Sequence, residues 1–282
     1  IILDLILVVP MGVAGAAVAT VASQAVSGII CTIYMTKKLK YLEFRKEDWT
    51  FSMRHCLKLC GMGLPMGLQY SITAIGSVIL QTAVNDMGST YVAAVSAGTK
   101  ISMFMCCPFD AMGSTMATYG GQNVGAKRLD RVDQGLKACI KMGIIYALVA
   151  LAFSIVFGKQ LALLFVKKEQ TELIGYIYEF VVANAAFYIC LALVNIVRFM
   201  IQGLGYSTFA ILAGICEMIA RSVAGFILVP HFGFICVSLG SPLAWVCADL
   251  FLIPAYLWVM KQLKRKFGED KMSNTKTATA TA

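Results

Sequence analysis

Long apolar runs, separated by short polar turns, make up most of the chain. A helix needs about 20 apolar residues to cross a bilayer, so we expect a helix end over residues 1–9 followed by full spans. The predicted spans are residues 13–36, 54–84, 91–120, 136–157, 173–202, 208–229 and 235–260. Glycine, proline and asparagine occur in the turns between them, as in residues 85–88 and 230–233. The pattern therefore predicts an all-α fold, a polytopic membrane helical bundle.

Composition and charge support a membrane protein. Hydrophobic residues make up 59% of the 282 residues and charged residues only 14%, against roughly 45 to 50% and 25% in soluble domains. The net charge of +9 is compatible with nucleic-acid binding, but alternate turns put most Lys and Arg residues on one side. The positive-inside rule places that side in the cytoplasm. The charge thus predicts a multi-pass protein of the cell membrane with a cytoplasmic C-terminus, and no nucleic-acid partner.

Metal and enzyme chemistry have little support in the sequence. Nearly all of the ten cysteines lie inside apolar runs, where we expect them to be small buried hydrophobic residues. The two histidines, His55 and His231, lie at predicted span ends on opposite sides. A membrane-embedded enzyme needs His, Asp, Cys or Ser converging at one depth. We therefore expect neither a metal site nor an enzyme.

Two similar segments indicate an internal repeat. Residues 12–19 precede the first full span and residues 233–240 precede the last, and both begin with glycine followed by small residues. Both run in the same direction through the membrane, as a parallel repeat about an axis along the membrane normal requires. If they are equivalent, the repeating unit has six helices. The second unit is then complete, and the chain is expected to be a fragment that begins inside the first.

Several short motifs, taken in order, resemble the multidrug and toxic compound extrusion (MATE) transporters over almost the whole chain. They are ILD at residues 2–4, GVAGAAVAT at 12–20, GLPMGLQ at 63–69, VAA at 92–94, GQNVGA at 121–126 and PLAW at 242–245. The resemblance implies two six-helix lobes that rock around a central cavity. It also implies a secondary active antiporter that exports xenobiotics and organic cations in exchange for Na⁺ or H⁺, with no cofactor beyond this coupling ion.

The resemblance also implies a domain organisation. Residues 1–36 would be the end of the N-lobe, with the tail of its fifth helix and its sixth helix, and residues 37–51 a cytoplasmic linker. Residues 52–262 would form the six-helix C-lobe, and residues 263–282 a disordered cytoplasmic tail. The first four to five helices would be missing, so we expect the chain to be inactive alone. Its expected partners are the missing N-lobe, membrane lipid, and small organic cations or other drugs.

Two features depart from the family pattern. Leu5 stands where the family often has proline, and residues 61–85 contain no acidic residue, although some members carry one on this helix. A carboxylate site on this helix is therefore not expected. Other members place the coupling carboxylate on their first helix.

Polar and ionisable residues inside the spans are the candidates for a substrate and ion pathway, because charges in a bilayer need a partner or a function. They are Gln69, Tyr70, Thr73, Lys100, Asp110, Asn184, Asn195, Glu217, Arg221 and Asp249. Glu217 and Arg221 have the i, i+4 spacing of a helical ion pair, which is either structural or faces the cavity and breaks during transport. Lys100 either lines the cavity or pairs with a carboxylate such as Asp249. Asp249 is either a salt-bridge partner or a protonation switch.

The remaining candidates have weaker signals. Asp110 follows Pro108, whose ring should free backbone carbonyls for neighbouring groups. Glu179 and Arg198 lie nearer helix ends, where each can reach an interface.

Asn184 and Asn195 either bind a cation or polar substrate group or join helices by hydrogen bonds. Gln69, Tyr70 and Thr73 are expected to face the lumen, because polar groups in lipid lose their hydration. The alternatives to an exporter are a lipid-linked oligosaccharide flippase of the same superfamily and a membrane-embedded enzyme.

Overall fold

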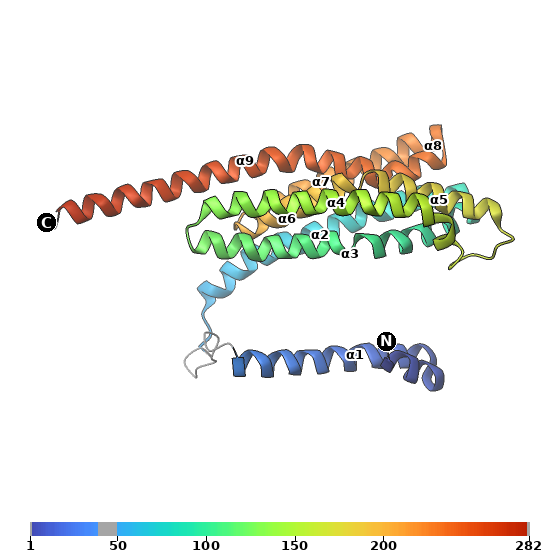
Figure 1. Ribbon diagram of the computed structural model, residues 1–282, viewed down its shortest axis with the longest axis horizontal. Coiled ribbons are helices and arrows are strands. Elements are labelled where there is room, and N and C mark those ends of the chain that lie inside the picture. Colours follow the sequence, from blue (N-terminus) through green and yellow to red (C-terminus); the bar gives the residue numbers. More distant parts are fainter. Residues whose placement is uncertain (1, 39–49, 281–282) are drawn as a thin grey trace. The chain divides into compact units, whose positions relative to one another are not determined.

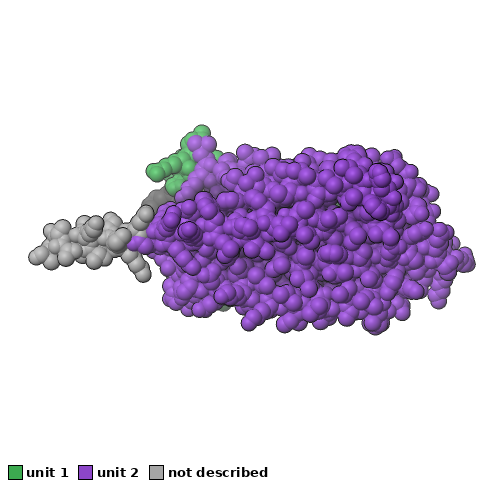
Figure 2. Space-filling view, turned by 90° about the horizontal axis from the view of Figure 1, so that it is seen from above, with its two compact units in different colours: residues 1–56 green, residues 57–282 purple. Residues whose placement is uncertain are grey.

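A computed structural model describes the backbone of residues 2–38 and 50–280, and the side chains through residue 268. The chain divides into two compact units, Ile1–Cys56 and Leu57–Ala282, which Figure 2 colours separately. The predicted linker at residues 37–51 lies mostly outside the described residues.

The first unit contains helix α1 (Ile2–Lys38), which is interrupted at Gly12. Gly12 has φ 56° and ψ −133°, a conformation with positive φ that glycine adopts without steric cost. Gly15 lies against the backbone of Leu7, where a Cβ atom would overlap the Leu7 carbonyl oxygen. The predicted helix end over residues 1–9 and the span from residue 13 are therefore confirmed as two segments separated by a glycine turn.

The second unit is a bundle of long helices (Figure 1). They are α2 (Met53–Met87), α3 (Ser89–Gly125), α4 (Leu129–Ala162), α5 (Thr171–Ala186), α6 (Tyr188–Gly203), α7 (Thr208–Val223), the π-helical segment η3 (Ala224–Leu228), α8 (Val229–Phe232) and α9 (Phe234–Ala280). Among the described residues, six helices are long and apolar enough to cross a membrane, and the α5–α6 pair brings the total to as many as seven. The predicted all-α membrane bundle is confirmed.

Helix α6 lies at the centre of this bundle. Eleven of its 16 residues are buried, and it packs against α3, α4, α7 and α9. Gly203 lets α6 approach α3 closely, because a Cβ atom there would overlap the backbone of Ala117. The ring of Tyr188 lies edge-on to Phe109 of α3, with centroids 5.7 Å apart. The side chains of α6 therefore face other helices on several sides.

The span predicted over residues 173–202 is broken into α5 and α6, which meet at an angle of 51°. Phe187 leaves helical geometry between them, with φ −106° and ψ 13°. Just before the break, the Asn184 amide donates to the carbonyl oxygen of Phe180 at 2.8 Å and to that of Ser238 at 3.3 Å. A side chain that bonds within the helical ladder and to a neighbouring helix is a known cause of such kinks. The prediction of one continuous helix was wrong here.

The two predicted repeat segments share a backbone conformation at their glycines. Gly233 has φ 66° and ψ −145° and lies between α8 and α9. Its dihedral angles are close to those of Gly12, which separates the two segments of α1. The predicted glycine turns therefore occur at both positions, in agreement with the proposed equivalence.

Successive connections between helices lie at opposite ends of the second unit, as the distribution of basic residues predicts. The α3–α4 turn and the C-terminal part of α9 lie at one end of the second unit, and the α4–α5 connection lies at the other (Figure 1). Lys127, Arg128 and the basic residues from Lys261 onward therefore share one end. The assignment of this end to the cytoplasm stays a prediction.

Two sequence expectations need correction. Leu263 is buried and Phe267 packs against the main apolar cluster, so α9 remains part of the bundle beyond residue 262, where the disordered tail was expected to begin. Of the ten free cysteines, only Cys139 and Cys236 are buried. The others lie partly or fully exposed on helix faces, because an apolar run in a membrane protein supplies outer faces as well as the interior.

Candidate functional site

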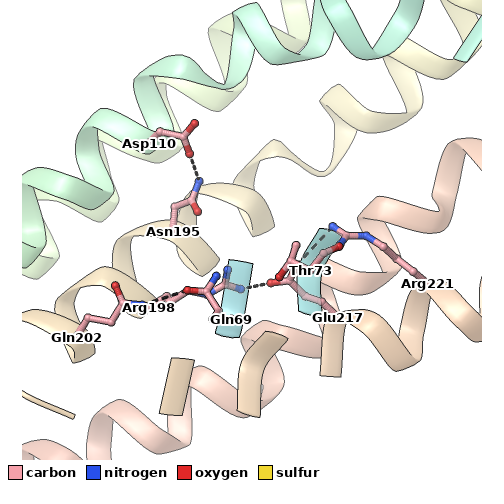
Figure 3. Close-up of polar contacts among 8 residues, drawn as sticks. All are labelled: Gln69, Thr73, Asp110, Asn195, Arg198, Gln202, Glu217 and Arg221. Carbon is pink, nitrogen blue, oxygen red and sulfur yellow. Dashed lines mark hydrogen bonds and ion pairs between the residues drawn. The ribbon is translucent and has the colours of Figure 1, made fainter. Parts of the chain in front are cut away.

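Three charged side chains are buried together between α6 and α7. Arg198 of α6 and Glu217 and Arg221 of α7 are only 5%, 2% and 6% exposed. Nη2 of Arg198 donates a hydrogen bond to Oε1 of Glu217, and Nη2 of Arg221 lies 3.5 Å from Oε2 of Glu217. Glu217 thus lies between two guanidinium groups (Figure 3), and the predicted Glu217–Arg221 pair is confirmed. We call Arg198, Glu217 and Arg221 the charged cluster.

Helical periodicity places these residues on inward faces. The buried residues of α7 are Ala210, Ala213, Gly214, Glu217 and Arg221, whose spacing of three and four defines one side of a helix. Small residues fill the first two turns of this face, and the charged pair follows. The inward face of α7 therefore delivers a carboxylate and a guanidinium directly to α6.

Helix α2 contributes two hydrogen-bond acceptors to this site. Nη1 of Arg221 donates to the carbonyl oxygen of Thr73 at 3.2 Å, and Nε2 of Gln202 donates to Oε1 of Gln69 at 3.2 Å. Gly214 of α7 faces this part of α2, because a Cβ atom there would lie 3.4 Å from Cγ of Gln69, in ordinary van der Waals contact. Polar contacts therefore join α2, α6 and α7 at the charged cluster (Figure 3).

Several buried polar atoms on α2, α6 and α9 lack a hydrogen-bond partner among the described residues. They include both carboxylate oxygens of Asp249, Nε of Arg198, Oε1 of Gln202 and Oγ1 of Thr73. Asp249 lies on α9 and is only 7% exposed. A buried carboxylate without a hydrogen bond is costly in its charged form, and uptake of a proton or a cation removes that cost.

The expected pairing of Lys100 with Asp249 is not found. Lys100 is exposed, and no described residue hydrogen-bonds to the Asp249 carboxylate. The buried residues near Lys100 on α3 are Ala97, Gly98 and Ile101. Lys100 therefore lies on a face of α3 that does not contact the other helices of the second unit, and its alternative role in lining a cavity stays a prediction.

Asp110 and Asn195 form a second polar contact, between α3 and α6. Nδ2 of Asn195 donates to Oδ1 of Asp110 at 3.1 Å, and Figure 3 shows this pair beside the charged cluster. The hydroxyl group of Tyr146 donates to the Met105 carbonyl oxygen at 2.9 Å, close to Pro108. The carbonyl that Pro108 leaves without a helical donor is that of Phe104, so the expected use of a freed carbonyl stays a prediction.

The structure brings some predicted candidates together and separates others. Thr73, Glu217 and Arg221 belong to one polar network, Gln69 bonds to Gln202, and Asn195 joins Asp110. Tyr70 is 56% exposed and lies outside the network. Asn184 occupies the α5–α6 break, where its hydrogen bonds are to backbone carbonyls.

Sequence reasoning missed Arg198 as a site residue and did not consider Gln202. Arg198 was expected to reach an interface, because it lies one turn from the end of its helix. Yet Asn195, Arg198 and Gln202 have the spacing of one helical face, and all three are buried. This polar stripe on an otherwise apolar helix was the available signal.

The charged cluster has a simple electrostatic property. The Glu217 carboxylate balances two guanidinium groups, so a proton or cation that reaches Glu217 weakens its attraction to both. Because those groups lie on α6 and α7, and Arg221 also contacts α2, such an event changes contacts between three helices. Glu217 and Asp249 are therefore the candidate ion-responsive residues.

Comparison with known proteins identifies the fold. A solved structure described as an outward-facing conformation of a multidrug resistance MATE family transporter of the MOP superfamily matches with a TM-score of 0.84. It is 23% identical, and the match covers 94% of this chain and 60% of that chain. The chain thus shares the fold of this transporter.

Two curated relatives from Bacillus subtilis (strain 168) are also similar. Probable multidrug resistance protein YoeA is 24% identical over 174 residues, 59% of this chain and 36% of that protein. Probable multidrug resistance protein YpnP is 28% identical over 168 residues, 58% of this chain and 37% of that protein. The chain therefore matches a little over a third of the length of these relatives.

A family model provides the assignment. The MatE model matches residues 65–227, which is more than half of the chain and includes the charged cluster. The chain belongs to the MatE family.

Proposed function

We propose that this chain supplies the C-lobe of a secondary active antiporter that exports xenobiotics and organic cations in exchange for Na⁺ or H⁺. Membership of the MatE family and the similarity to two probable multidrug resistance proteins support this function. In the proposal, residues 52–262 and the adjoining part of α9 that packs against them form the C-lobe, which works with an N-lobe. The protein lies in the cell membrane with its C-terminus in the cytoplasm.

The observation that carries the proposal is the pair of buried carboxylates at the centre of the bundle. Glu217 is held by two arginines, and Asp249 has no hydrogen-bond partner among the described residues. Ionisable groups inside a membrane bundle are costly, so they commonly belong to ion or substrate pathways. A carboxylate that exchanges a proton or Na⁺ is the chemical element that coupled transport requires.

The two carboxylates have different roles in this proposal. Asp249 takes up the coupling ion, because its carboxylate has no competing hydrogen bond. Glu217 responds to that charge through the guanidinium groups of the charged cluster. A change in these ion pairs alters the contacts of α6, α7 and α2, which provides a route from ion binding to helix movement.

Transport by reconstituted protein tests the proposal. The protein, as its gene expresses it, is placed in vesicles with a fluorescent organic cation, and a Na⁺ or proton gradient is imposed. We expect one of these gradients to drive movement of the cation. The absence of movement with either gradient would contradict the proposal.

A matched pair of variants assigns the coupling role. Asp249→Asn removes the buried carboxylate, and gradient-driven transport should fall to the level of empty vesicles. Asp130→Asn removes an exposed carboxylate that pairs with Arg128 at 3.3 Å, and transport should be unchanged. Equal activity of the two variants would show that Asp249 has no role in coupling.

The same vesicles distinguish the exporter from the flippase alternative. A flippase moves a lipid-linked sugar and gives no gradient-driven movement of an organic cation. Vesicles that contain a labelled lipid-linked sugar therefore provide the second substrate. Movement of the sugar without movement of the cation would favour the flippase.

A further inference from the structure

A cleft lies between α4 and α9, at the basic end of the second unit. It has a volume of about 480 Å³. Its lining comes from one acidic residue of α4 and a series of residues along α9. The lining residues are Asp133, Tyr256, Leu257, Met260, Lys261, Lys264 and Arg265.

The acidic residue of the cleft already has partners within it. Oδ1 of Asp133 accepts a hydrogen bond from the Tyr256 hydroxyl group at 2.8 Å, and Oδ2 accepts one from Nζ of Lys264 at 3.5 Å. Lys261 and Arg265 form no salt bridge with any residue that the structure describes. The lining thus has a formal charge of +2, because three cationic side chains face one carboxylate.

The polarity of the cleft changes along α9. Leu257 and Met260 line the part nearer the membrane interior, and Lys261, Lys264 and Arg265 line the part nearer the helix end. Leu257 is 65% exposed, and its neighbour Trp258 is 47% exposed. Tryptophan is enriched where the membrane meets water. The cleft therefore presents an apolar surface beside a basic one, at the depth of lipid headgroups.

We propose that this cleft binds the headgroup of an anionic phospholipid. The phosphate group lies among Lys261, Lys264 and Arg265, and the first part of an acyl chain lies against Leu257 and Met260. Basic pockets between transmembrane helices are suited to anionic headgroups, and the adjoining apolar wall favours a lipid over a free phosphate ion. The proposal does not depend on which solute the protein transports.

Native mass spectrometry of the 282-residue chain in detergent tests the proposal. The protein is titrated with phosphatidylglycerol and, separately, with zwitterionic phosphatidylcholine, and bound lipid is counted. We expect one phosphatidylglycerol to bind more tightly than any phosphatidylcholine. Inorganic phosphate at the same concentration should not displace it, because phosphate cannot use the apolar wall. Displacement by phosphate, or equal binding of both lipids, would overturn the proposal.

A charge-matched pair of variants localises the site. Lys261→Gln with Arg265→Gln removes two cations from the cleft, and each basic residue contributes roughly a fivefold change in affinity at an anionic membrane surface. Binding of phosphatidylglycerol should weaken about 25-fold on that basis. Lys167→Gln with Lys168→Gln removes two exposed cations from the α4–α5 connection and should leave binding unchanged. Equal weakening in both double variants would overturn the proposal.

A third variant should strengthen binding, which misfolding cannot mimic. Asp133→Asn removes the only negative charge of the lining but keeps an amide oxygen that can accept from Tyr256. Lys264 is then released for the phosphate, and affinity for phosphatidylglycerol should rise about fivefold. Circular dichroism checks that helix content is unchanged. Weaker binding by this variant at native helix content would contradict the proposal.

Discussion

The guanidinium group of Arg198 on α6 donates a hydrogen bond to the carboxylate of Glu217 on α7, and both side chains are buried. Arg221 approaches the other oxygen of the same carboxylate. Glu217 is therefore the shared partner of two cations in the interior of the bundle. This arrangement makes the stability of the second unit unusually sensitive to the charge at one position.

Glu217→Gln should strongly destabilise the protein. The substitution leaves Arg198 and Arg221 buried without a counter-charge, and removal of one partner of a buried ion pair costs about 3 to 5 kcal/mol. Thermal unfolding of the purified protein in detergent measures the effect. Asp130→Asn, which breaks an exposed pair, is the matched control and should leave the unfolding temperature nearly unchanged.

The coupling between Arg198 and Glu217 can be measured separately. We expect the double variant Arg198→Gln with Glu217→Gln to be less destabilised than the sum of the single variants, by about 1 to 3 kcal/mol. The reason is that removal of both members leaves fewer buried charges without a partner. Additive effects would show that the two side chains do not interact in the membrane protein.

Asp249→Asn should change the unfolding temperature in the opposite direction from Glu217→Gln. The Asp249 carboxylate is buried without a hydrogen bond, so a neutral amide of the same shape removes the cost of a buried charge. We expect a higher unfolding temperature together with the loss of coupled transport, because functional groups are often held at a cost in stability. A lower unfolding temperature would mean that Asp249 has a stabilising partner.

Substitutions of Gln69 and Gln202 should have non-additive effects on the stability of the protein. Gln202→Leu alone leaves the buried Gln69 amide without its donor, which costs about 1 to 3 kcal/mol. Replacement of both glutamines by leucine removes both polar groups and should recover most of that loss. Comparison of the three variants by thermal unfolding measures the recovery, and a double variant worse than the single one would contradict the prediction.

Gly203→Ala should loosen the contact between α6 and α3. The added methyl group would overlap the backbone carbonyl of Ala117, and a backbone group cannot rotate away as a side chain can. Overpacking of this kind costs about 1 to 3 kcal/mol. Gly175→Ala adds a methyl group where nothing lies within 4 Å, so this control should not lower the unfolding temperature.

The predicted orientation can be tested with a fluorescent protein at the C-terminus. Green fluorescent protein folds in the bacterial cytoplasm but not after export through the general secretory pathway. We therefore expect fluorescent cells when it follows Ala282. Dark cells that still contain the full-length fusion would contradict the positive-inside assignment and place the basic end of the bundle outside.

The sequence by itself determined the features that depend on short-range spacing along the chain and on the length of each apolar run. Apolar run lengths gave the helices, because a span must cross a fixed thickness of lipid. The glycine turns at Gly12 and Gly233 were visible because positive φ angles favour glycine. The Glu217–Arg221 pair was predicted because both residues lie on one helix, where spacing alone decides whether side chains meet.

Only the tertiary structure decided which face of each helix is inward. In a lipid-exposed bundle both faces of a helix are apolar, so the pattern shows the depth of a polar residue but not the direction in which it points. Lys100 was a candidate partner of Asp249, but its side chain is exposed on the second unit and the Asp249 carboxylate has no hydrogen-bond partner among the described residues. Arg198 was expected at an interface and is buried against Glu217. Contacts between helices depend on rotations about several axes at once, and packing fixes those rotations only when all the helices are present.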